Sequence, residues 1–329
     1  MNDYPKIKFA IAGCGHIGKR HAMLISNHLD AELVALADNN TAVAADMDQY
    51  HLPFFASVDE LLQSNLAFDV LCVATPNGWH ETHSVQGLRS AHHVIIEKPM
   101  ALTKAGCERI IDAAVQQQRR VFCVMQNRFS PPAAWLNQLV KENGLGKIFM
   151  VQVNCYWNRD ERYYIKDNWH GSKDQDGGVL FTQFSHFIDT LLWIFGDITH
   201  INSRIANFNH PELIGFEDSG IISFDFEQGG MGCLNFSTAV WKENLESSIT
   251  VIAEKGTVKI GGQYLNEVVY CNVKDYDMPV LPSTDSNNHQ YVFNNVVNVL
   301  RHGTEDTTVT DGLRVVETIE QIYKMVKWV

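Results

Sequence analysis

The stretch Ile7-Lys8-Phe9-Ala10-Ile11-Ala12-Gly13-Cys14-Gly15-His16-Ile17-Gly18 decides the fold of this chain. A short apolar run, typical of a buried strand, leads directly into Gly-x-Gly-x-x-Gly, and a helical pattern follows. In this context Gly13 permits a tight turn, Gly15 lets the backbone approach a pyrophosphate, and Gly18 lets helix and strand pack closely. The free N–H groups at the helix start, at His16 and Ile17, suit a negative charge. The stretch therefore predicts a dinucleotide-binding turn.

A carboxylate follows at the end of the second apolar run. Asp38 stands 20 residues beyond Gly18, where an acidic side chain accepts hydrogen bonds from the ribose hydroxyls of NAD. Two asparagines come next, so no Arg or Lys is there to bind a 2′-phosphate, which Asp38 itself would repel. The sequence thus favours NAD over NADP. We interpret the side chains of Cys14 and His16 as fillers at variable positions of the turn.

Short apolar runs alternate with helix-like stretches over residues 1–125, which indicates parallel βαβ units. The expected strands are Ile7–Ala12, Glu32–Ala37, Pro53–Phe55, Val70–Ala74, His93–Glu97 and Val121–Val124. Helices are expected near Ile17–Asn27, Asp59–Gln63, Thr82–Ser90 and Lys104–Gln118. The first domain, residues 1–125, is therefore predicted to be an α/β, doubly wound parallel Rossmann sheet that binds NAD.

The rhythm changes after Met125, and residues 126–329 are expected to form an α+β domain for substrate binding and oligomerisation. An amphipathic helix is predicted from Val179 to Phe195, and two final helices near His289–Leu300 and Asp311–Trp328. Short turns join most strand-like runs, which favours a large open, mainly antiparallel sheet. Those runs are Ile148–Trp157, Ile201–Phe208, Ser219–Phe226, Gly232–Thr238, Ser248–Ala253, Thr257–Ile260 and Val268–Val273. Because such a sheet leaves one face uncovered, we expect a homodimer or homotetramer through it.

The composition is that of a globular protein of two domains, and an enzyme is the first hypothesis. The chain has 329 residues, of which 45% are hydrophobic and 19% are charged. A formal net charge of −12 disfavours nucleic acid and anionic membranes as partners. We expect neither a signal peptide nor a membrane span. Seven cysteines without a C-x-x-C pair fit free thiols in a reducing, cytoplasmic location.

Two further segments follow strands of the first domain, at the edge where open α/β sheets bind ligands. The first is Thr75-Pro76-Asn77-Gly78-Trp79-His80 and the second is Glu97-Lys98-Pro99. A lysine between an acidic residue and a proline is held on a short bend, so its ammonium can be aimed at a nicotinamide and a substrate oxygen.

These motifs, in this order, resemble the glucose–fructose oxidoreductase, inositol dehydrogenase and rhizopine-catabolism (Gfo/Idh/MocA) family. The resemblance rests on the glycine turn, Thr75-Pro76-Asn77 with His80, Glu97-Lys98-Pro99, and Gly177-Gly178 followed by His186-x-x-Asp189. It covers essentially the whole chain, and Glu-Lys-Pro is its most specific motif. It implies transfer of a hydride between a carbon that bears a hydroxyl and the nicotinamide of NAD. It also implies that Thr75, Pro76, Asn77, His80, Glu97 and Lys98 contribute to the cofactor site.

By the same resemblance Lys98 is the catalytic lysine that orients the substrate hydroxyl, and His186 is the acid/base. The family usually has an Asp four residues before this histidine, and here that position is Thr182. A threonine takes up no proton at neutral pH, so the usual relay is incomplete. Thr182 and His186 are still expected to share a helix face, where Thr182 can bind a substrate hydroxyl. Asp189 is assigned either to this side or to helix packing.

The loop before that helix is rich in aromatic and polar residues, which suits the faces and hydroxyls of a pyranose. Its candidate substrate ligands are Arg159, Tyr163, Trp169 and His170, and either Arg159 or Arg162 can hold a carboxylate or phosphate. Trp-x-Gly before Gly177-Gly178 also resembles family branches that act on nucleotide-linked N-acetylated uronic acids. We therefore expect a sugar or nucleotide-sugar acid of the UDP-N-acetylglucosaminuronate type, with inositol or a free sugar as the alternative.

Two alternatives belong to other classes. A catalytically silent NAD-binding sensor would keep the glycines and Asp38 but has no need of Lys98 or His186. A zinc site from His186, Asp189 and His170 is formally possible, but no tight cluster of His and Cys supports it in the sequence, and we expect no metal.

Overall fold

The computed structural model describes residues 4–165, 168–282 and 288–329. The chain divides into two compact units, Met1–Val124 with His289–Val316, and Met125–Asn288 with Glu317–Val329. The sequence analysis placed residues 289–316 in the second domain, whereas here they group with the first unit. Among the described residues, no helix combines the length and the apolar character needed to cross a membrane.

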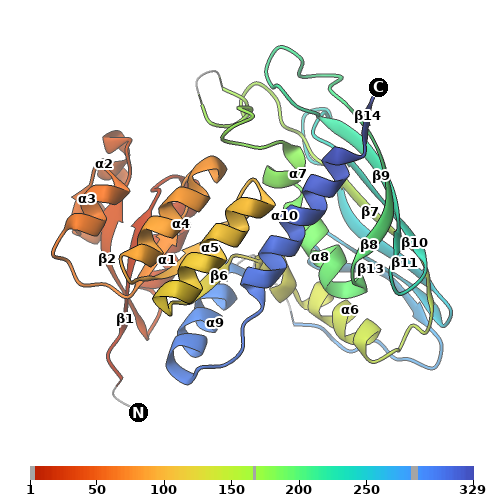
Figure 1. Cartoon of the computed structure of the whole chain (residues 1–329). Coiled ribbons are helices and arrows are strands. Elements are labelled where there is room, and N and C mark those ends of the chain that lie inside the picture. The colour runs from red at the N-terminus through yellow and green to blue at the C-terminus, as the bar shows by residue number, and fades with distance from the viewer. Residues whose placement is uncertain (1–3, 166–167, 283–287) are drawn as a thin grey trace. The chain divides into compact units, whose positions relative to one another are not determined.

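The first unit holds a six-stranded parallel sheet in the order β3-β2-β1-β4-β5-β6 (Figure 1). Its strands are β1 (Ile7–Ala12), β2 (Ala31–Ala37), β3 (Phe54–Phe55), β4 (Val70–Val73), β5 (His93–Ile96) and β6 (Val121–Cys123). Each predicted strand is found, with ends that shift by no more than one residue, and the Rossmann fold is confirmed. The strand order reverses between β1 and β4, which is where such sheets bind their ligands.

Helices connect and cover these strands. They are α1 (His16–Ser26), α2 (Ala44–Met47), α3 (Val58–Gln63), α4 (His80–Arg89), α5 (Lys104–Gln117) and, from the later chain, α9 (Asn288–His302). Every residue of β4 is buried, as expected for a central strand covered on both faces. The ring of Phe293 on α9 lies edge-on to Phe9 at 6.2 Å and to His21 at 5.1 Å, which accounts for the return of this helix to the first unit.

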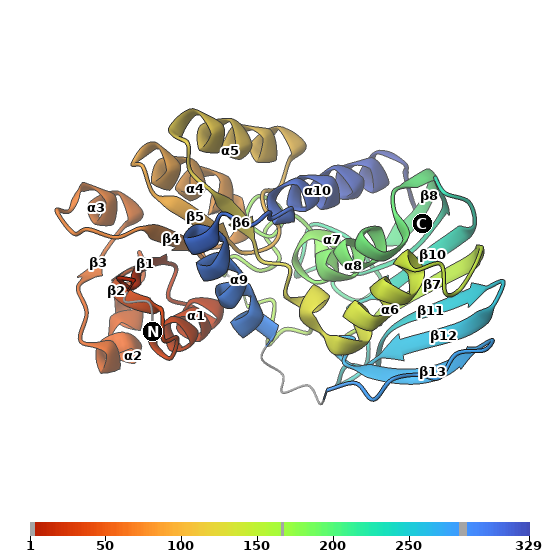
Figure 2. The ribbon, with the colours of Figure 1, turned by 90° about the horizontal axis from the view of Figure 1, so that it is seen from below.

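The second unit holds an eight-stranded sheet in the order β13-β12-β11-β7-β10-β9-β8-β14 (Figure 2). Its strands are β7 (Ile148–Tyr156), β8 (Ile198–Ala206), β9 (Ser219–Phe226), β10 (Met231–Ser237), β11 (Glu246–Ala253), β12 (Gly256–Gly261), β13 (Glu267–Val273) and β14 (Val326–Trp328). Two pairs, β10 with β7 and β14 with β8, are parallel, and the other pairs are antiparallel. The predicted open, mainly antiparallel sheet is confirmed.

The last helix was predicted too long. α10 (Thr308–Lys324) ends before Val326–Trp328, which pairs with β8 instead of continuing the helix to Trp328. The apolar residues that suggested a longer helix are thus the residues of an edge strand.

Three helices lie over one face of the large sheet (Figure 2): α6 (Pro131–Lys141), α7 (Val179–Thr182) and α8 (Ser185–Phe195). The single helix predicted from Val179 to Phe195 is wrong, because Gln183 and Phe184 interrupt it. Phe184 is fully buried, and its ring lies 5.6 Å from that of Trp157 and 5.5 Å from that of Phe236. Thr182 is therefore the last residue of α7 and His186 the second residue of α8, so the two residues do not share one continuous helix face.

Candidate active site

The glycine turn after β1 has the geometry that a dinucleotide requires. Gly13 has a φ of +93°, and a Cβ at this position would stand 2.5 Å from the backbone of Ala74. A Cβ on Gly18 would overlap the carbonyl oxygen of Gly13, so glycine is needed here for helix and strand to pack. A Cβ on Gly15 would meet no atom of the chain within 4 Å. Packing does not explain glycine at Gly15, whereas close approach by a ligand does.

The start of α1 suits an anion. The helix begins at His16, whose side chain is exposed, and Ile17 is half-buried. The N-cap residue, Gly15, has no side chain that could accept a hydrogen bond from the first N–H groups of the helix. The first turn contains no acidic residue. The first N–H groups of α1 therefore keep their capacity to bind a pyrophosphate.

Asp38 follows β2 directly and closes onto the glycine turn. One of its carboxylate oxygens accepts a hydrogen bond from the N–H of Cys14 at 2.7 Å, and the other from the N–H of Asn40 at 2.8 Å. Each oxygen retains capacity for a further donor, such as a ribose hydroxyl. Burial, and then the charge of Asp38, raise the pKa of the Cys14 thiol to about 12, so Cys14 is an inert thiol at neutral pH.

His80 contacts both of the segments that follow β4 and β5, Thr75–His80 and Glu97–Pro99. Its Nδ1 lies 2.7 Å from the carbonyl oxygen of Pro99, and its Nε2 lies 2.8 Å from that of Thr75. Asn77 is buried, Pro76 is half-buried, and the hydroxyl of Thr75 is 3.0 Å from Nδ1 of His83. Both ring nitrogens of His80 thus contact the chain itself, so this residue positions the two segments.

Glu97 holds the bend that carries Lys98. The carboxylate accepts a hydrogen bond from the N–H of Lys98 at 3.2 Å and another from Nε2 of His21 at 2.9 Å. Burial alone would raise the pKa of Glu97, but the hydrogen bond and charge of His21 outweigh it and hold the pKa well below its ordinary value. Glu97 is therefore an ionised, buried anchor. Lys98 follows it, is half-buried, and is joined to Pro99 by a cis peptide bond.

One group among the described residues brings three possible metal ligands together. Donor atoms of His21, Glu97 and His289 lie within 4.8 Å of one another, with Nε2 of His289 3.8 Å from Oε1 of Glu97. Burial lowers the pKa of His289 to about 4, so this ring is neutral. Because Glu97 is ionised, Nε2 of His21 donates to it and has no lone pair for a metal. The geometry is that of a hydrogen-bonded cluster.

In the second unit, His186 meets a residue that the sequence analysis missed. The amide nitrogen of Gln126 lies 2.9 Å from Nε2 of His186, and both side chains are buried. Because the amide N–H donates, Nε2 of the neutral ring accepts and the proton resides on Nδ1. The basic lone pair of His186 is therefore at Nε2. Gln126 stands three residues after the end of β6, so the rule that pointed to the ends of β4 and β5 would also have found it.

Thr182 is paired with a second residue that was missed. Its hydroxyl donates to Asp176, both to the carboxylate and, at 2.9 Å, to the backbone carbonyl. The other carboxylate oxygen of Asp176 accepts the N–H of Gly171 at 2.8 Å. Asp176 is 1% exposed. A carboxylate thus stands beside Thr182, although it comes from a position before the Gly177-Gly178 turn rather than from the helix.

Asp189 has a structural role. Two nitrogens of Arg128 contact its carboxylate, at 2.9 and 2.5 Å, and the guanidinium also lies 5.4 Å from the ring centre of Trp193. Both members of the ion pair are nearly buried. Of the two assignments left open for Asp189, helix packing fits this geometry.

The predicted substrate loop separates its two arginines. Arg159 lies over the rings of Trp157 and Tyr163, at 4.8 and 5.0 Å, and donates to the amide oxygen of Gln183 at 3.1 Å. The amide nitrogen of Gln183 in turn donates to the hydroxyl of Tyr163 at 2.6 Å. Arg162, by contrast, is exposed and occupied by Asp160. Of the two arginines, Arg159 is therefore the one whose guanidinium is held by neighbouring side chains of the loop and of Gln183.

Trp169 and His170 form a stack with ring centres 3.8 Å apart, and the ring of His170 lies 4.2 Å from that of Tyr163. The structure thus brings the guanidinium of Arg159 and the rings of Tyr163, Trp169 and His170 into one group. Lys98 belongs to the first unit, and Thr182 and His186 belong to the second.

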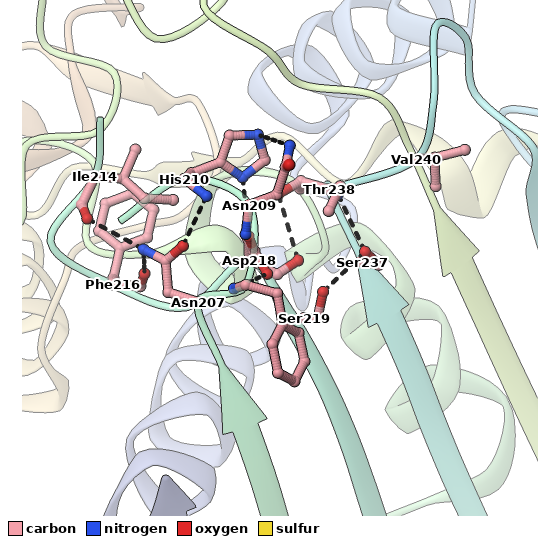
Figure 3. Close-up of polar contacts among 12 residues, drawn as sticks. Asn207, Asn209, His210, Ile214, Phe216, Asp218, Ser219, Ser237, Thr238 and Val240 are labelled. Atoms are coloured by element: carbon pink, nitrogen blue, oxygen red, sulfur yellow. Dashed lines mark hydrogen bonds and ion pairs between the residues drawn. The ribbon is translucent and has the colours of Figure 1, made fainter. Parts of the chain in front are cut away.

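A buried polar network supports this loop (Figure 3). The carboxylate of Asp218 accepts hydrogen bonds from Nδ1 of His210 at 3.0 Å and from the N–H of Asn209 at 2.7 Å. Burial would raise the pKa of Asp218, but these donors hold it below its ordinary value. The ring of His210 lies 5.4 Å from that of Tyr164, next to Tyr163. The network thereby fixes the segment against which the loop packs.

Two models of known protein families match this chain, one up to residue 125 and one after it. Residues 7–125 match the model described as "Oxidoreductase family, NAD-binding Rossmann fold", and residues 134–259 match the "GFO/IDH/MocA C-terminal domain". The chain belongs to the Gfo/Idh/MocA family. The cofactor of the Rossmann domain is accordingly NAD, as the glycine turn and Asp38 predicted.

Among solved structures of similar proteins, the WlbA dehydrogenase from Bordetella pertussis, in complex with NADH and UDP-GlcNAcA, is 32% identical. The similarity covers 97% of this chain and 96% of that one, with a TM-score of 0.89. The glucose-6-phosphate 3-dehydrogenase of Bacillus subtilis is 25% identical and covers 96% of this chain and 95% of its own. The 2,7-anhydro-N-acetylneuraminate hydratase of Escherichia coli is also 25% identical, over 78% of this chain and 68% of its own. These three relatives are each described with a sugar derivative as ligand or in the name of the enzyme.

Proposed function

We propose that this Gfo/Idh/MocA protein is an NAD-dependent dehydrogenase that oxidises a secondary hydroxyl of a sugar or nucleotide-sugar acid, of the UDP-N-acetylglucosaminuronate type. The observation that carries the proposal is the similarity, over nearly the whole chain, to a WlbA dehydrogenase solved with NADH and UDP-GlcNAcA. The polar aromatic group around Arg159 supports a ligand that has both a sugar ring and a negative charge.

In this proposal the residues of the first unit bind the cofactor and steady the reacting oxygen. The turn from Gly13 to Gly18 holds the pyrophosphate, and Asp38 holds the adenosine ribose. When bound, NAD supplies the acceptor for the hydride. The ammonium of Lys98 stabilises the negative charge that develops on the hydroxyl oxygen, and Glu97 fixes the backbone from which Lys98 extends.

The residues of the second unit remove the proton and orient the sugar. Nε2 of His186 takes the hydroxyl proton, and in doing so it exchanges the donor Gln126 for the substrate hydroxyl. Thr182, oriented by Asp176, contacts a neighbouring hydroxyl of the sugar. Arg159 binds the carboxylate or phosphate, and Tyr163, Trp169 and His170 contact the ring.

The proposal includes assembly and location. Apolar side chains are exposed on the large sheet, among them Ile221, Met231 and Ile252, and they support a homodimer or homotetramer through this face. All seven cysteines are free, which supports a cytoplasmic location.

The test is a nicotinamide-absorbance screen of the purified protein with NAD or NADP against UDP-sugar acids, sugar acids, free sugars and inositols. We expect NADH formation with a UDP-sugar acid, and a loss of at least about 100-fold in turnover for Lys98→Ala with NAD binding retained. Lys104→Ala, an exposed lysine on α5, is the matched control and is expected to keep full activity.

The alternatives give different outcomes in the same screen. Turnover of inositol or a free sugar in preference to UDP-sugar acids would replace the substrate class. NAD binding without turnover of any member would favour the NAD-binding sensor and contradict the proposed activity.

A further inference from the structure

A buried carboxyl in the second unit takes no part in the chemistry proposed above. Glu217, which lies two residues before the start of β9, is 1% exposed. The hydroxyl of Tyr323, on α10, donates to its Oε1 at 2.5 Å. The backbone N–H groups of Val179 and Leu180 donate to the same carboxyl. Glu217 therefore contacts the first two residues of α7, the helix that ends at Thr182.

The same pair closes on the Gly177-Gly178 turn. Gly178 has a φ of +121°, and a Cβ there would overlap the hydroxyl of Tyr323 and stand 3.4 Å from Oε1 of Glu217. The carbonyl oxygen of Gly178 accepts the N–H of Thr182 at 3.1 Å. The ring of Tyr323 is stacked on that of Phe181 at 6.0 Å. The turn, α7 and Thr182 thus rest on two side chains that come from distant parts of the sequence.

We propose that Glu217 and Tyr323 form a positioning pair, which fixes the Gly177-Gly178 turn and the start of α7, and with them Thr182, and which loosens when Glu217 loses its proton. The inference rests on the proposed function, in which Thr182 and His186 contact the sugar. Neither Glu217 nor Tyr323 is assigned contact with the substrate.

The electrostatic surroundings of Glu217 give the direction of this response. Burial raises the pKa of Glu217 to about 7, and the hydrogen bonds from Tyr323, Leu180 and Val179 limit the rise. Burial, then Glu217 and, more weakly, the carboxylate of Asp176 raise the pKa of Tyr323. The largest influences on the pKa of Glu217 after burial are hydrogen bonds from neutral groups, and none of these partners is a cation. Its ionised form is therefore held at a cost.

The pKa of Glu217 differs between the closed and the open form of the segment. When the segment opens locally, Glu217 reaches water and regains the ordinary carboxyl pKa. Between that value and about 7 the closed form binds one proton more than the open form, so opening becomes easier as pH rises. The opening equilibrium changes on the order of tenfold per pH unit in this window and levels off above about pH 7.

The test is amide hydrogen exchange of peptides that span residues 177–184, corrected for the intrinsic rate, between pH 5 and 8. In the unaltered protein, protection is expected to fall about tenfold per pH unit up to about pH 7 and then to level off. Glu217→Gln keeps the size and an acceptor oxygen but cannot ionise, so its protection should not change with pH. Glu267→Gln, an exposed residue at the start of β13, is the matched control and should behave as the unaltered protein.

Tyr323→Phe keeps the ring on Phe181 and removes one donor to Glu217. Because that donor lowers the pKa of Glu217, the loss of protection should extend to higher pH. This variant also carries the test if Glu217→Gln does not fold. Protection that is independent of pH in the unaltered protein, or an equal slope in Glu217→Gln, would overturn the pair.

Kinetics separate this inference from the proposed function. With the sugar substrate, KM relative to that of Glu217→Gln should rise severalfold between pH 6 and 8, with kcat less affected. Activity that depends on Lys98 with no such change in KM would refute the positioning of Thr182 and leave the proposed function intact. Absence of turnover would refute the proposed function, while hydrogen exchange would still decide the role of the pair.

Discussion

The cofactor turn of the first unit and the substrate segment of the second are built in different ways. The turn from Gly13 to Gly18 presents backbone N–H groups at the start of α1, and the residues that shape it lie at the end of one strand and the start of one helix. Around His186, the contacts are side chain to side chain, and the partners are 60 residues apart for Gln126. A site that is formed by backbone groups can thus be predicted from a short motif. A site that is formed by contacts between distant side chains depends on how the whole unit packs.

The largest expected loss of stability comes from removing a long-range contact between side chains of the second unit. Arg128→Ala leaves the buried carboxylate of Asp189 without its bidentate partner, so we expect a loss of about 3 to 5 kcal/mol in the free energy of unfolding. Urea denaturation measures this loss. Arg162→Ala, which removes the exposed partner of Asp160, should leave the midpoint unchanged. Equal midpoints for the two variants would show that the Arg128–Asp189 pair does not support α8.

The next prediction distinguishes the roles of two glycines in the cofactor turn. Gly18→Ala drives a Cβ into the carbonyl of Gly13 and should lower both the melting temperature and NAD affinity. Gly15 has a φ of −70° and open space around it, so Gly15→Ala should keep the melting temperature and weaken NAD binding at least about tenfold. Calorimetric titration and thermal unfolding measure both quantities. Unweakened NAD binding by Gly15→Ala would contradict the assignment of this turn to the pyrophosphate.

The smallest of these effects concerns cofactor choice. Asp38→Ala removes acceptors for the ribose hydroxyls and a charge that repels a 2′-phosphate, so NAD should bind roughly fivefold more weakly and NADP less unfavourably. Titration of both cofactors into both proteins measures the ratio. Equal affinity of the unaltered protein for NAD and NADP would rule out discrimination by Asp38.

Much of the fold could be predicted because its signals are local. The apolar run Ile7–Ala12 and the run Ser219–Phe226 have the same bounds in the sequence analysis and in the structure. The break after Thr182 could not be predicted, because the helical pattern continues through Phe184 and only the packing of its ring against Trp157 and Phe236 interrupts the helix. The strand Val326–Trp328 was missed for the same reason, since it forms by pairing with β8, which is more than 100 residues earlier in the sequence.

The candidate site divides along the same line. Gly15, Asp38 and Lys98 stand in short motifs after strands, and the sequence analysis proposed all of them. Asp176 and Glu217 stand in no such motif. An acidic residue in a polar loop is expected to be exposed to solvent, and only the structure shows that these two are buried. Their significance comes from Thr182 and Tyr323, which contact them only in the folded unit.

In the proposed reaction Lys98 and His186 act on the same substrate hydroxyl, and a double-mutant cycle of kcat/KM with the identified substrate tests this proposal directly. Lys98→Ala and His186→Ala are each expected to lose at least about 100-fold, and the double variant should be little worse than the weaker single variant. Losses that multiply in the double variant would contradict the account, because they would mean that the two residues act independently.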